Sequence, residues 1–185
     1  MFHRVAERVR QAARRCRDAQ CDGAPQPIRG RFEFRVVGAV SPEAAEAVSA
    51  LEGLAEFAGK KPQRELPAEY AWGDIFVFPT IQDGFAVVLA QAAAAALPIL
   101  TTTNCCGPDL IREGETGWVL PVRDPEAFLA RLEWCDSHRE ELAGMIAASY
   151  NHFRPRDWSD VAADFEDLCR TEITARSTAR NSVHV

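Results

Sequence analysis

The sequence predicts an α/β protein: a doubly wound, Rossmann-like parallel sheet that is followed by C-terminal helices. Strand-like and helix-like patterns alternate from residue 32 onward, and this alternation favours parallel strands joined by crossover helices. Residues 74–79 and 98–102 are almost entirely apolar, as expected of strands buried on both faces. Residues 85–96, between them, have almost no polar face and fit a helix packed against such a sheet.

The elements are expected in the following order. Residues 2–19 predict a helix, because apolar side chains recur there at helical spacing. Residues 32–37 are aromatic and β-branched and predict a strand. Ser41 and Pro42 suit the N-cap and first position of a helix that should run to about residue 54. Further strands are expected at 56–58, 74–79, 98–102 and 117–120, and further helices at 66–72, 85–96, 109–112, 125–135, 139–153 and 158–173.

Composition indicates one globular domain. Of the 185 residues, 47% are hydrophobic and 26% are charged, and residues 1–174 are expected to fold together before a polar, flexible tail over 175–185. The net charge of −6 argues against a nucleic-acid partner, which normally requires a basic surface. The longest apolar stretch, residues 85–100, is interrupted by Gln91 and Pro98, so no transmembrane segment is expected.

No motif for a metal or a cofactor stands out. The six cysteines match no zinc-binding spacing, and we interpret them as reduced thiols of a cytoplasmic protein. The four histidines are scattered and fit neither a metal site nor a catalytic triad. The glycine-rich loops typical of nicotinamide and ATP sites do not occur in the sequence, so no cofactor is expected.

The turn at residues 79–86, which reads Pro-Thr-Ile-Gln-Asp-Gly-Phe-Ala, joins a buried strand to a buried helix. Ligands of open α/β sheets bind at the carboxyl ends of the strands, and a helix N-terminus offers free N–H groups to an anion. Asp83 either caps the helix or faces a ligand. Gln91 is the one polar side chain in the helix; it either bonds a neighbouring backbone group or lies at the helix edge, or it faces the ligand crevice.

Several collinear motifs in roughly residues 30–170 resemble the donor-binding half of group 1, retaining glycosyltransferases of the GT-B fold. Residues 70–80 resemble the segment before that family's donor site, and residues 83–91 keep the spacing of its Glu-x7-Glu motif. Residues 96–102 and 107–114 are similar to the next strand and its glycine turn. Residues 116–127 resemble the family's TGxLVP and DPEA signature.

The resemblance implies a domain that binds a nucleoside-diphosphate sugar as substrate and transfers the sugar, with retention, to an unknown acceptor. Asp83 would contact the sugar hydroxyls as the catalytic-site residue, and Gln91 would contact the ribose. The turn formed by Gly84, Phe85 and Ala86 would line the sugar and phosphate. Gly59 and Lys60 would belong to the loop on the base side of the site; the alternative for Lys60 and Lys61 is a solvated loop.

The sequence departs from the family at three site positions. Asp83 is one methylene shorter than the family's Glu, Gln91 carries no charge, and Ala86 replaces a glycine. A positive φ at Ala86 would therefore be costly. These departures place activity in question more than the fold.

The family's opening strand, which carries a basic pair for the diphosphate, is not recognisable, and neither is the acceptor-binding domain. In the strand order 3-2-1-4-5-6 the missing strand is central, so unpaired sheet edges and exposed apolar surface are expected. A separate acceptor-domain protein, or self-association, would then complete the molecule. The alternative to an enzyme is a degenerate, non-catalytic donor-domain subunit or fragment that depends on such a partner.

Overall fold

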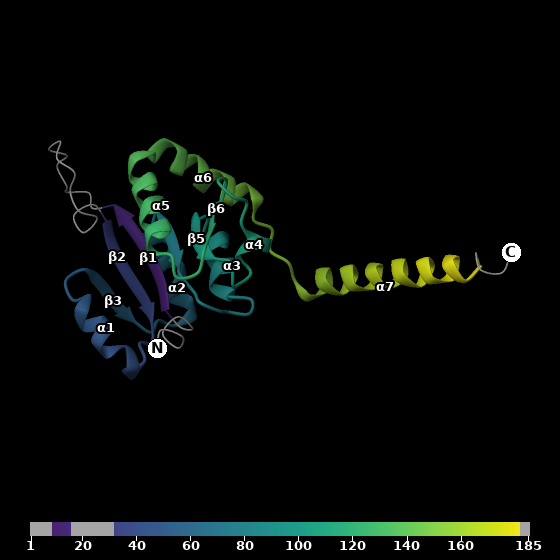
Figure 1. Ribbon diagram of the computed structural model, residues 1–185, viewed down its shortest axis with the longest axis horizontal. Helices are drawn as coiled ribbons and strands as arrows, with labels where there is room; N and C mark the ends of the chain where they lie inside the picture. The colour runs from purple at the N-terminus through teal and green to yellow at the C-terminus, as the bar shows by residue number, and fades with distance from the viewer. Residues whose placement is uncertain (1–8, 16–31, 182–185) are drawn as a thin grey trace. The chain divides into compact units, whose positions relative to one another are not determined.

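The computed structural model describes residues 9–15 and 32–181 (Figure 1). Within these residues the strands form one sheet in the order β3-β2-β1-β4-β5-β6. The pairs β2–β3, β4–β5 and β5–β6 are parallel, whereas β1 runs antiparallel to both of its neighbours. Helices flank the sheet, and the Rossmann-like α/β fold predicted from the sequence is confirmed. The strands are β1 (Val9–Arg15), β2 (Phe32–Gly38), β3 (Ala55–Gly59), β4 (Ile75–Phe78), β5 (Ile99–Thr102) and β6 (Gly117–Leu120).

The helix expected over residues 2–19 is wrong for residues 9–15, which form β1; residues 2–8 and 16–19 lie outside the described part of the chain. β1 pairs with β2 from Val9↔Gly38 to Arg15↔Phe32, and with β4 from Gln11↔Val77 to Ala13↔Ile75. It therefore fills the central position that was expected to be empty. The physical reason is that β2 and β4 each present an edge of N–H and C=O groups, and satisfying both edges outweighs a local helical periodicity.

The helices otherwise follow the predicted order. They are α1 (Ala45–Ala50), α2 (Leu66–Trp72), α3 (Val87–Ala94), α4 (Gly107–Leu110), α5 (Pro125–Ser137), α6 (Arg139–His152) and α7 (Trp158–Asn181). Short 3-10 turns at Pro42–Ala44 and Gln63–Glu65 lead into α1 and α2. The helix expected over 85–96 is shorter at both ends, because Ala86 and Ala96 adopt left-handed conformations, with φ of 51° and 60°.

Hydrophobic residues bury both faces of the sheet, as the apolar strands predicted. Alternate residues of β4 point to opposite sides. Ile75 and Val77 belong to the cluster completed by α5 and α6, whereas Phe76 and Phe78 belong to the cluster completed by α2 and α3. The carboxyl ends of β2, β3 and β4 are thereby held between two rigid layers, and this arrangement positions the loops that follow them.

The chain divides into two compact units, Met1–Phe153 and Arg154–Val185. The first contains the sheet and helices α1 to α6, and the second contains α7. Residues 175–181, where the sequence predicts a flexible tail, are helical because α7 continues to Asn181. The assignment of residues 1–174 to a single donor-binding domain stays a prediction.

Candidate functional site

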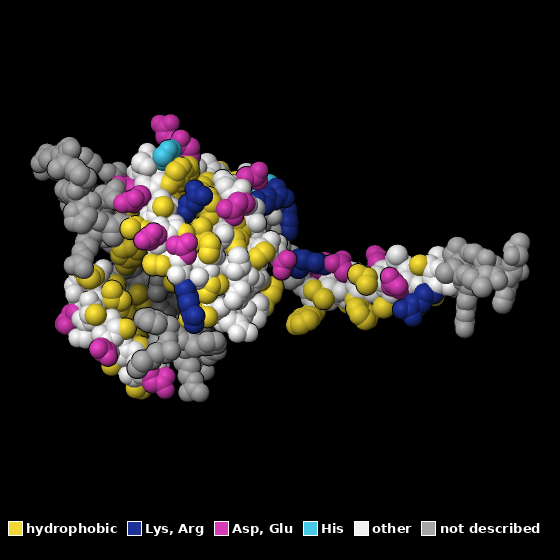
Figure 2. Space-filling model, in the orientation of Figure 1, with side chains coloured by type: hydrophobic (Ala, Val, Ile, Leu, Met, Phe, Trp, Pro, Cys, Tyr) yellow, Lys and Arg dark blue, Asp and Glu magenta, His cyan; other side chains and the backbone are white. Residues whose placement is uncertain are grey.

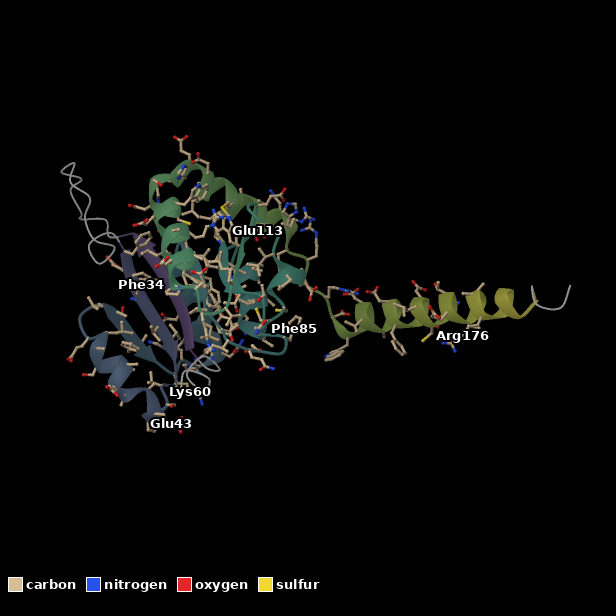
Figure 3. The ribbon with its side chains drawn as sticks, viewed as in Figure 1. Phe34, Glu43, Lys60, Phe85, Glu113 and Arg176 are labelled. Carbon is tan, nitrogen blue, oxygen red and sulfur yellow. The ribbon has the colours of Figure 1, made fainter. Side chains whose placement is uncertain are left out.

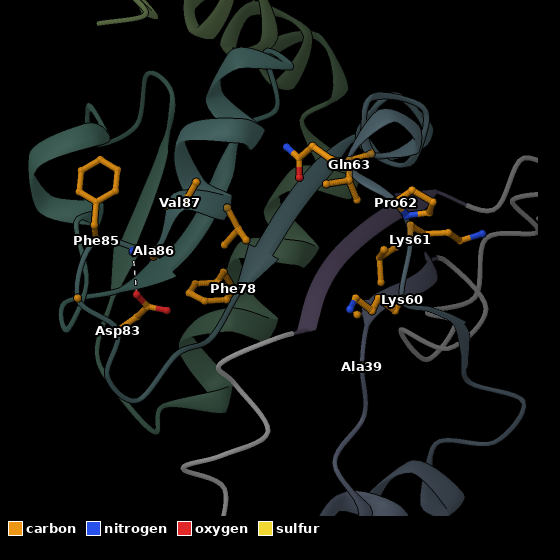
Figure 4. Close-up of a pocket in the computed structure, with 15 residues that line it drawn as sticks. Ala39, Lys60, Lys61, Pro62, Gln63, Phe78, Asp83, Phe85, Ala86 and Val87 are labelled. Carbon is orange, nitrogen blue, oxygen red and sulfur yellow. Dashed lines mark hydrogen bonds between the residues drawn. The ribbon is translucent and has the colours of Figure 1, made fainter. Parts of the chain in front are cut away.

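The turn between β4 and α3 is built around the carboxylate of Asp83. The N–H of Ala86 donates to Asp83 Oδ1 at 2.7 Å, so this side chain closes the turn at the helix N-terminus. The N–H of Asp83 itself donates to the carbonyl of Asn104 at 3.0 Å. Asp83 thus performs the capping role that the sequence offered as one of two readings, while its second oxygen is directed toward the open side of the turn (Figure 4).

The end of β5 and the loop after it hold this turn in place. The Thr101 hydroxyl donates to the Phe78 carbonyl at 2.9 Å, and the Thr102 hydroxyl donates to the Thr80 carbonyl at 2.6 Å. The Asn104 amide donates to the Ile81 carbonyl at 3.0 Å. These three bonds hold the backbone of residues 78–81, which leads into Asp83. These bonds were not predicted from the sequence, although two threonines at the end of an otherwise apolar strand indicate that the end of the strand bonds a neighbour.

A cavity of about 840 Å³ opens beside the turn, at the carboxyl ends of β2, β3 and β4 (Figure 4). One wall is the turn with the start of α3, and it contains Asp83, Gly84, Phe85 and Ala86. The opposite wall comes from the loops after β2 and β3. Its lining residues are Gly38, Ala39, Lys60, Lys61, Pro62 and Gln63. The position agrees with the rule that ligands of open α/β sheets bind beyond the carboxyl ends of the strands.

The two lysines of the cavity differ in their surroundings. Lys61 Nζ lies 3.4 Å from Glu69 Oε1, and Glu69 also pairs with Arg35 at 3.4 Å. Lys60 is exposed and has no ion pair to a described residue. Figure 4 shows the Lys61 side chain extending away from the Asp83 turn and the Lys60 side chain near Ala39, on the wall opposite that turn. Lys60 is therefore the cation that is free to meet an anion in the cavity.

The turn also exposes apolar side chains at the rim of the cavity. Phe85 is 62% exposed and Val87 is 60% exposed, and both line it. Figure 3 shows Phe85 projecting outward from the turn. Gly84 has open space around it, so its backbone is accessible to a ligand from the side of the cavity. Neither Gly84 nor Phe85 donates its N–H to another group in the part of the chain that the structure describes.

Gln91 lies outside the lining of this cavity. Its Oε1 accepts a hydrogen bond of 2.9 Å from the Tyr70 hydroxyl, and the pair joins α3 to α2. The sequence offered a bond to a neighbouring backbone group, a place at the helix edge or a place in the ligand crevice; the observed partner is instead a side-chain hydroxyl of another helix. Gly59, at the end of β3 with φ of 68°, adjoins Lys60 but does not itself line the cavity.

The Cys106 thiol next to the site is held neutral. Burial, with smaller effects from the charges of Cys105 and Asp83, raises the pKa of Cys106 to about 11. Cys105 Sγ accepts from the Gly107 N–H at 3.4 Å and helps to shape the loop. Among the described residues, no group of three or more potential metal ligands is arranged to hold an ion, and no helix is long and apolar enough to span a bilayer.

A family model described as "Glycosyl transferases group 1" matches residues 18–136, which is more than half of the chain. The chain belongs to this family. It is 32% identical over 130 residues to the amylovoran biosynthesis glycosyltransferase AmsK of Erwinia amylovora, covering 65% of this chain and 32% of AmsK. It is 34% identical over 88 residues to a colanic acid biosynthesis glycosyltransferase, WcaL, of Salmonella typhimurium, covering 44% of this chain and 22% of WcaL.

The fold of this group 1 glycosyltransferase chain is also found in solved structures. Anabaena Alr3699/HepE in complex with UDP aligns with a TM-score of 0.58 at 13% identity, covering 73% of this chain and 40% of that one. A likeness at this identity shows the fold alone. The chain spans only about a quarter to a third of the curated relatives it matches.

Proposed function

We propose that the cavity beside the Asp83 turn binds a nucleoside-diphosphate sugar as the donor substrate of a retaining glycosyl transfer. The observation that carries the proposal is the pairing of the two walls. One wall offers a carboxylate and unoccupied backbone N–H groups, and the other offers the Lys60 cation. The HepE structure contains UDP, so uracil is the base that we expect first.

Each part of the donor has a matching group in this proposal. The free oxygen of Asp83 accepts hydrogen bonds from sugar hydroxyls, and the N–H groups of Gly84 and Phe85 donate to the sugar and phosphate. The Lys60 ammonium lies near the diphosphate and takes the role that a basic pair has in the family. The backbone of Gly59 and Lys60 faces the base. Gln91 would contact the ribose only if its Oε1 left the Tyr70 hydroxyl.

In the proposed reaction an acceptor hydroxyl oxygen bonds to the anomeric carbon while the bond from that carbon to the nucleoside diphosphate breaks, and the hydroxyl proton passes to an oxygen of the departing diphosphate. The diphosphate leaves with the electron pair, and the Lys60 ammonium and the turn N–H groups stabilise its growing charge. Asp83 orients the sugar, so positioning supplies much of the remaining catalysis. The acceptor groups and any acceptor domain would come from outside the described cavity, and we place the reaction in carbohydrate biosynthesis in the cytoplasm.

The test is thermal unfolding of the purified chain with UDP, GDP, ADP and their sugars. A ligand that binds only the folded state stabilises it by about 2.7 kcal/mol at a hundredfold excess over its dissociation constant. Asp83→Asn keeps an oxygen for the Ala86 N–H but removes the charge, so it should fold normally and lose the part of the shift that depends on the sugar. Asp83→Ala should lose the cap as well, at a cost of about 1 kcal/mol.

Glu43→Ala, which changes an exposed carboxylate before α1, is the control and should respond to nucleotides as the native chain does. If no nucleotide shifts the unfolding midpoint of the native chain, the proposed donor site is wrong. If nucleotide sugars bind but no sugar is transferred or hydrolysed, the chain is a non-catalytic donor module. Gln91 stands at the position of the family's second acidic residue, and its side-chain oxygen is already bonded to the Tyr70 hydroxyl. This bond favours the second candidate, a non-catalytic module.

A further inference from the structure

Glu69, in helix α2, is engaged by two cations at the same time. Its Oε1 lies 3.4 Å from Lys61 Nζ, and its Oε2 accepts a hydrogen bond of 3.4 Å from the Arg35 guanidinium. The Glu69 side chain is only 16% exposed. Ion pairs that are partly shielded from water are screened less than fully exposed ones. The Glu69 carboxylate therefore holds the ammonium of Lys61, although Lys61 also lines the cavity.

Arg35 has other partners in this network, whereas Lys61 has no second ion pair among the described residues. Arg35 Nε donates to Glu56 Oε2 at 2.8 Å, and Arg35 Nη2 lies 2.8 Å from the same oxygen. The guanidinium carbon of Arg35 also lies 4.2 Å from the centre of the Trp72 ring, which is close enough for a cation–π contact. Without the Glu69 charge, Arg35 would stay in place and the ammonium of Lys61 would be released.

The charges around the cavity nearly cancel because of this arrangement. Asp83, Lys60 and Lys61 are the charged side chains of its described lining. Glu69 offsets the charge of Lys61, so Lys60 and the carboxylate of Asp83 remain. On the face of the first unit seen in Figure 2, basic and acidic side chains are interspersed, so this face does not add a broad field of one sign. A highly charged anion is thus attracted mainly by Lys60 and the backbone N–H groups of the turn.

We propose that Glu69 is a specificity-determining residue: by engaging Lys61, it makes the cavity favour a nucleoside-diphosphate sugar over free nucleoside di- and triphosphates. This inference rests on the donor site proposed above. The free nucleotides carry more negative charge, because the second proton of a terminal phosphate is lost at about pH 6, whereas a phosphate esterified to a sugar has no such proton. A released Lys61 would attract these more highly charged ligands most. Glu69 therefore weakens their competition with the sugar donor, and it lets the diphosphate product leave the site more easily.

Titration calorimetry with UDP-glucose, UDP and UTP tests the proposal in the native chain and in Glu69→Gln. Divalent cations are left out, because they would neutralise part of the phosphate charge. The substitution nearly keeps the shape of the side chain, and Arg35 keeps Glu56 and Trp72, so the variant should fold and should release Lys61. We expect its affinity to rise by about tenfold for UTP, about fivefold for UDP and less than about twofold for UDP-glucose, as for one additional charge-assisted contact. The affinity for uridine should not change.

Two further variants separate the Lys61 contact from other effects of the lost charge. Glu56→Gln removes the same charge from a carboxylate whose described ion partner is Arg35, and it should leave all of these affinities unchanged. Lys61→Met combined with Glu69→Gln should remove the gain. A gain that persists in this double variant, or that is equal for the three nucleotides, overturns the role of Glu69. The same holds if Glu69→Gln binds UTP no better than the native chain does. A native chain that binds none of the nucleotides overturns the donor site as well.

Discussion

At the scale of single residues, the site depends on which charges are already engaged. Lys60 and Lys61 are neighbours in sequence and both line the cavity, yet Lys61 is held 3.4 Å from Glu69 while Lys60 has no described ion partner. A lysine engaged by a carboxylate contributes less to an incoming diphosphate, because binding would have to replace an existing attraction. The pair therefore provides a matched comparison of two lysines in one cavity.

We predict that Lys60→Met lowers the affinity for UDP by about tenfold to a hundredfold, the equivalent of roughly 1.5–3 kcal/mol for a charge-assisted contact. Lys61→Met should lower it less than about threefold. Neither change should alter the affinity for uridine, which has no phosphate. Titration calorimetry with UDP and uridine measures all of these values. Equal losses in both variants, or a loss of uridine binding in Lys60→Met, would contradict this assignment of the diphosphate to Lys60.

The sequence identified a turn whose residues line a cavity, but it did not identify the contacts of that turn, and the binding roles of its residues stay predictions. Asp83, Gly84, Phe85 and Ala86 were chosen from one turn, and the structure brings them together on one wall of a cavity. Asn104, which bonds to this turn, could not be chosen, because its bonds join residues about twenty positions apart. The Tyr70 partner of Gln91 is equally remote in the sequence. Spacing along one element identifies candidate residues, but it does not identify the long-range partner that occupies one of them.

At the scale of elements, α3 ends in a geometry that alanine does not favour. The N–H of Leu97 donates to the Ala92 carbonyl at 3.0 Å, and the N–H of Ala96 donates to the Ala93 carbonyl at 2.9 Å. This is the Schellman pattern, in which the residue after the cap adopts a left-handed conformation and is usually glycine. Here that residue is Ala96, with φ of 60°.

We predict that Ala96→Gly stabilises the fold by up to about 1 kcal/mol. The left-handed conformation costs a non-glycine residue about 1–2 kcal/mol, and glycine relieves this strain. Glycine also loses more chain entropy on folding, which offsets about 0.5–1 kcal/mol of the stabilisation. Ala90→Gly, within the same helix, should destabilise by about 1 kcal/mol or more. Urea unfolding at one fixed protein concentration measures both changes. A destabilised Ala96→Gly would mean that packing of the methyl group outweighs the backbone strain.

The predictions of strands β4 and β5 from continuous apolar runs are confirmed, and the residues of both strands are buried on both faces of the sheet. They failed for β1, where the pattern at Val9 and Ala12 fits a helix and only pairing with β2 and β4 makes a strand. The order of the sheet was expected, but an antiparallel strand at its centre was not. The residues of β1 give no local sign of its direction, because that direction is set by pairing with β2 and β4, which lie later in the sequence.

At the scale of the whole molecule, the unit that holds the cavity and the unit that holds α7 should open independently of each other. In the first unit, β4 and β5 lie between two buried clusters, so their amides exchange only when the core unfolds. Neither of the two buried clusters includes a residue of α7, so its amides should exchange through local fraying.

We therefore predict that the backbone amides of residues 158–173 exchange with solvent much faster than those of β4 and β5. Exchange in α7 requires only local opening of one helix, whereas exchange in β4 and β5 requires the core of the first unit to unfold. Mass spectrometry of exchanged peptides makes the measurement. Exchange in α7 that is as slow as in β4 and β5 would mean that this helix opens only together with the core, and that the two units fold as one.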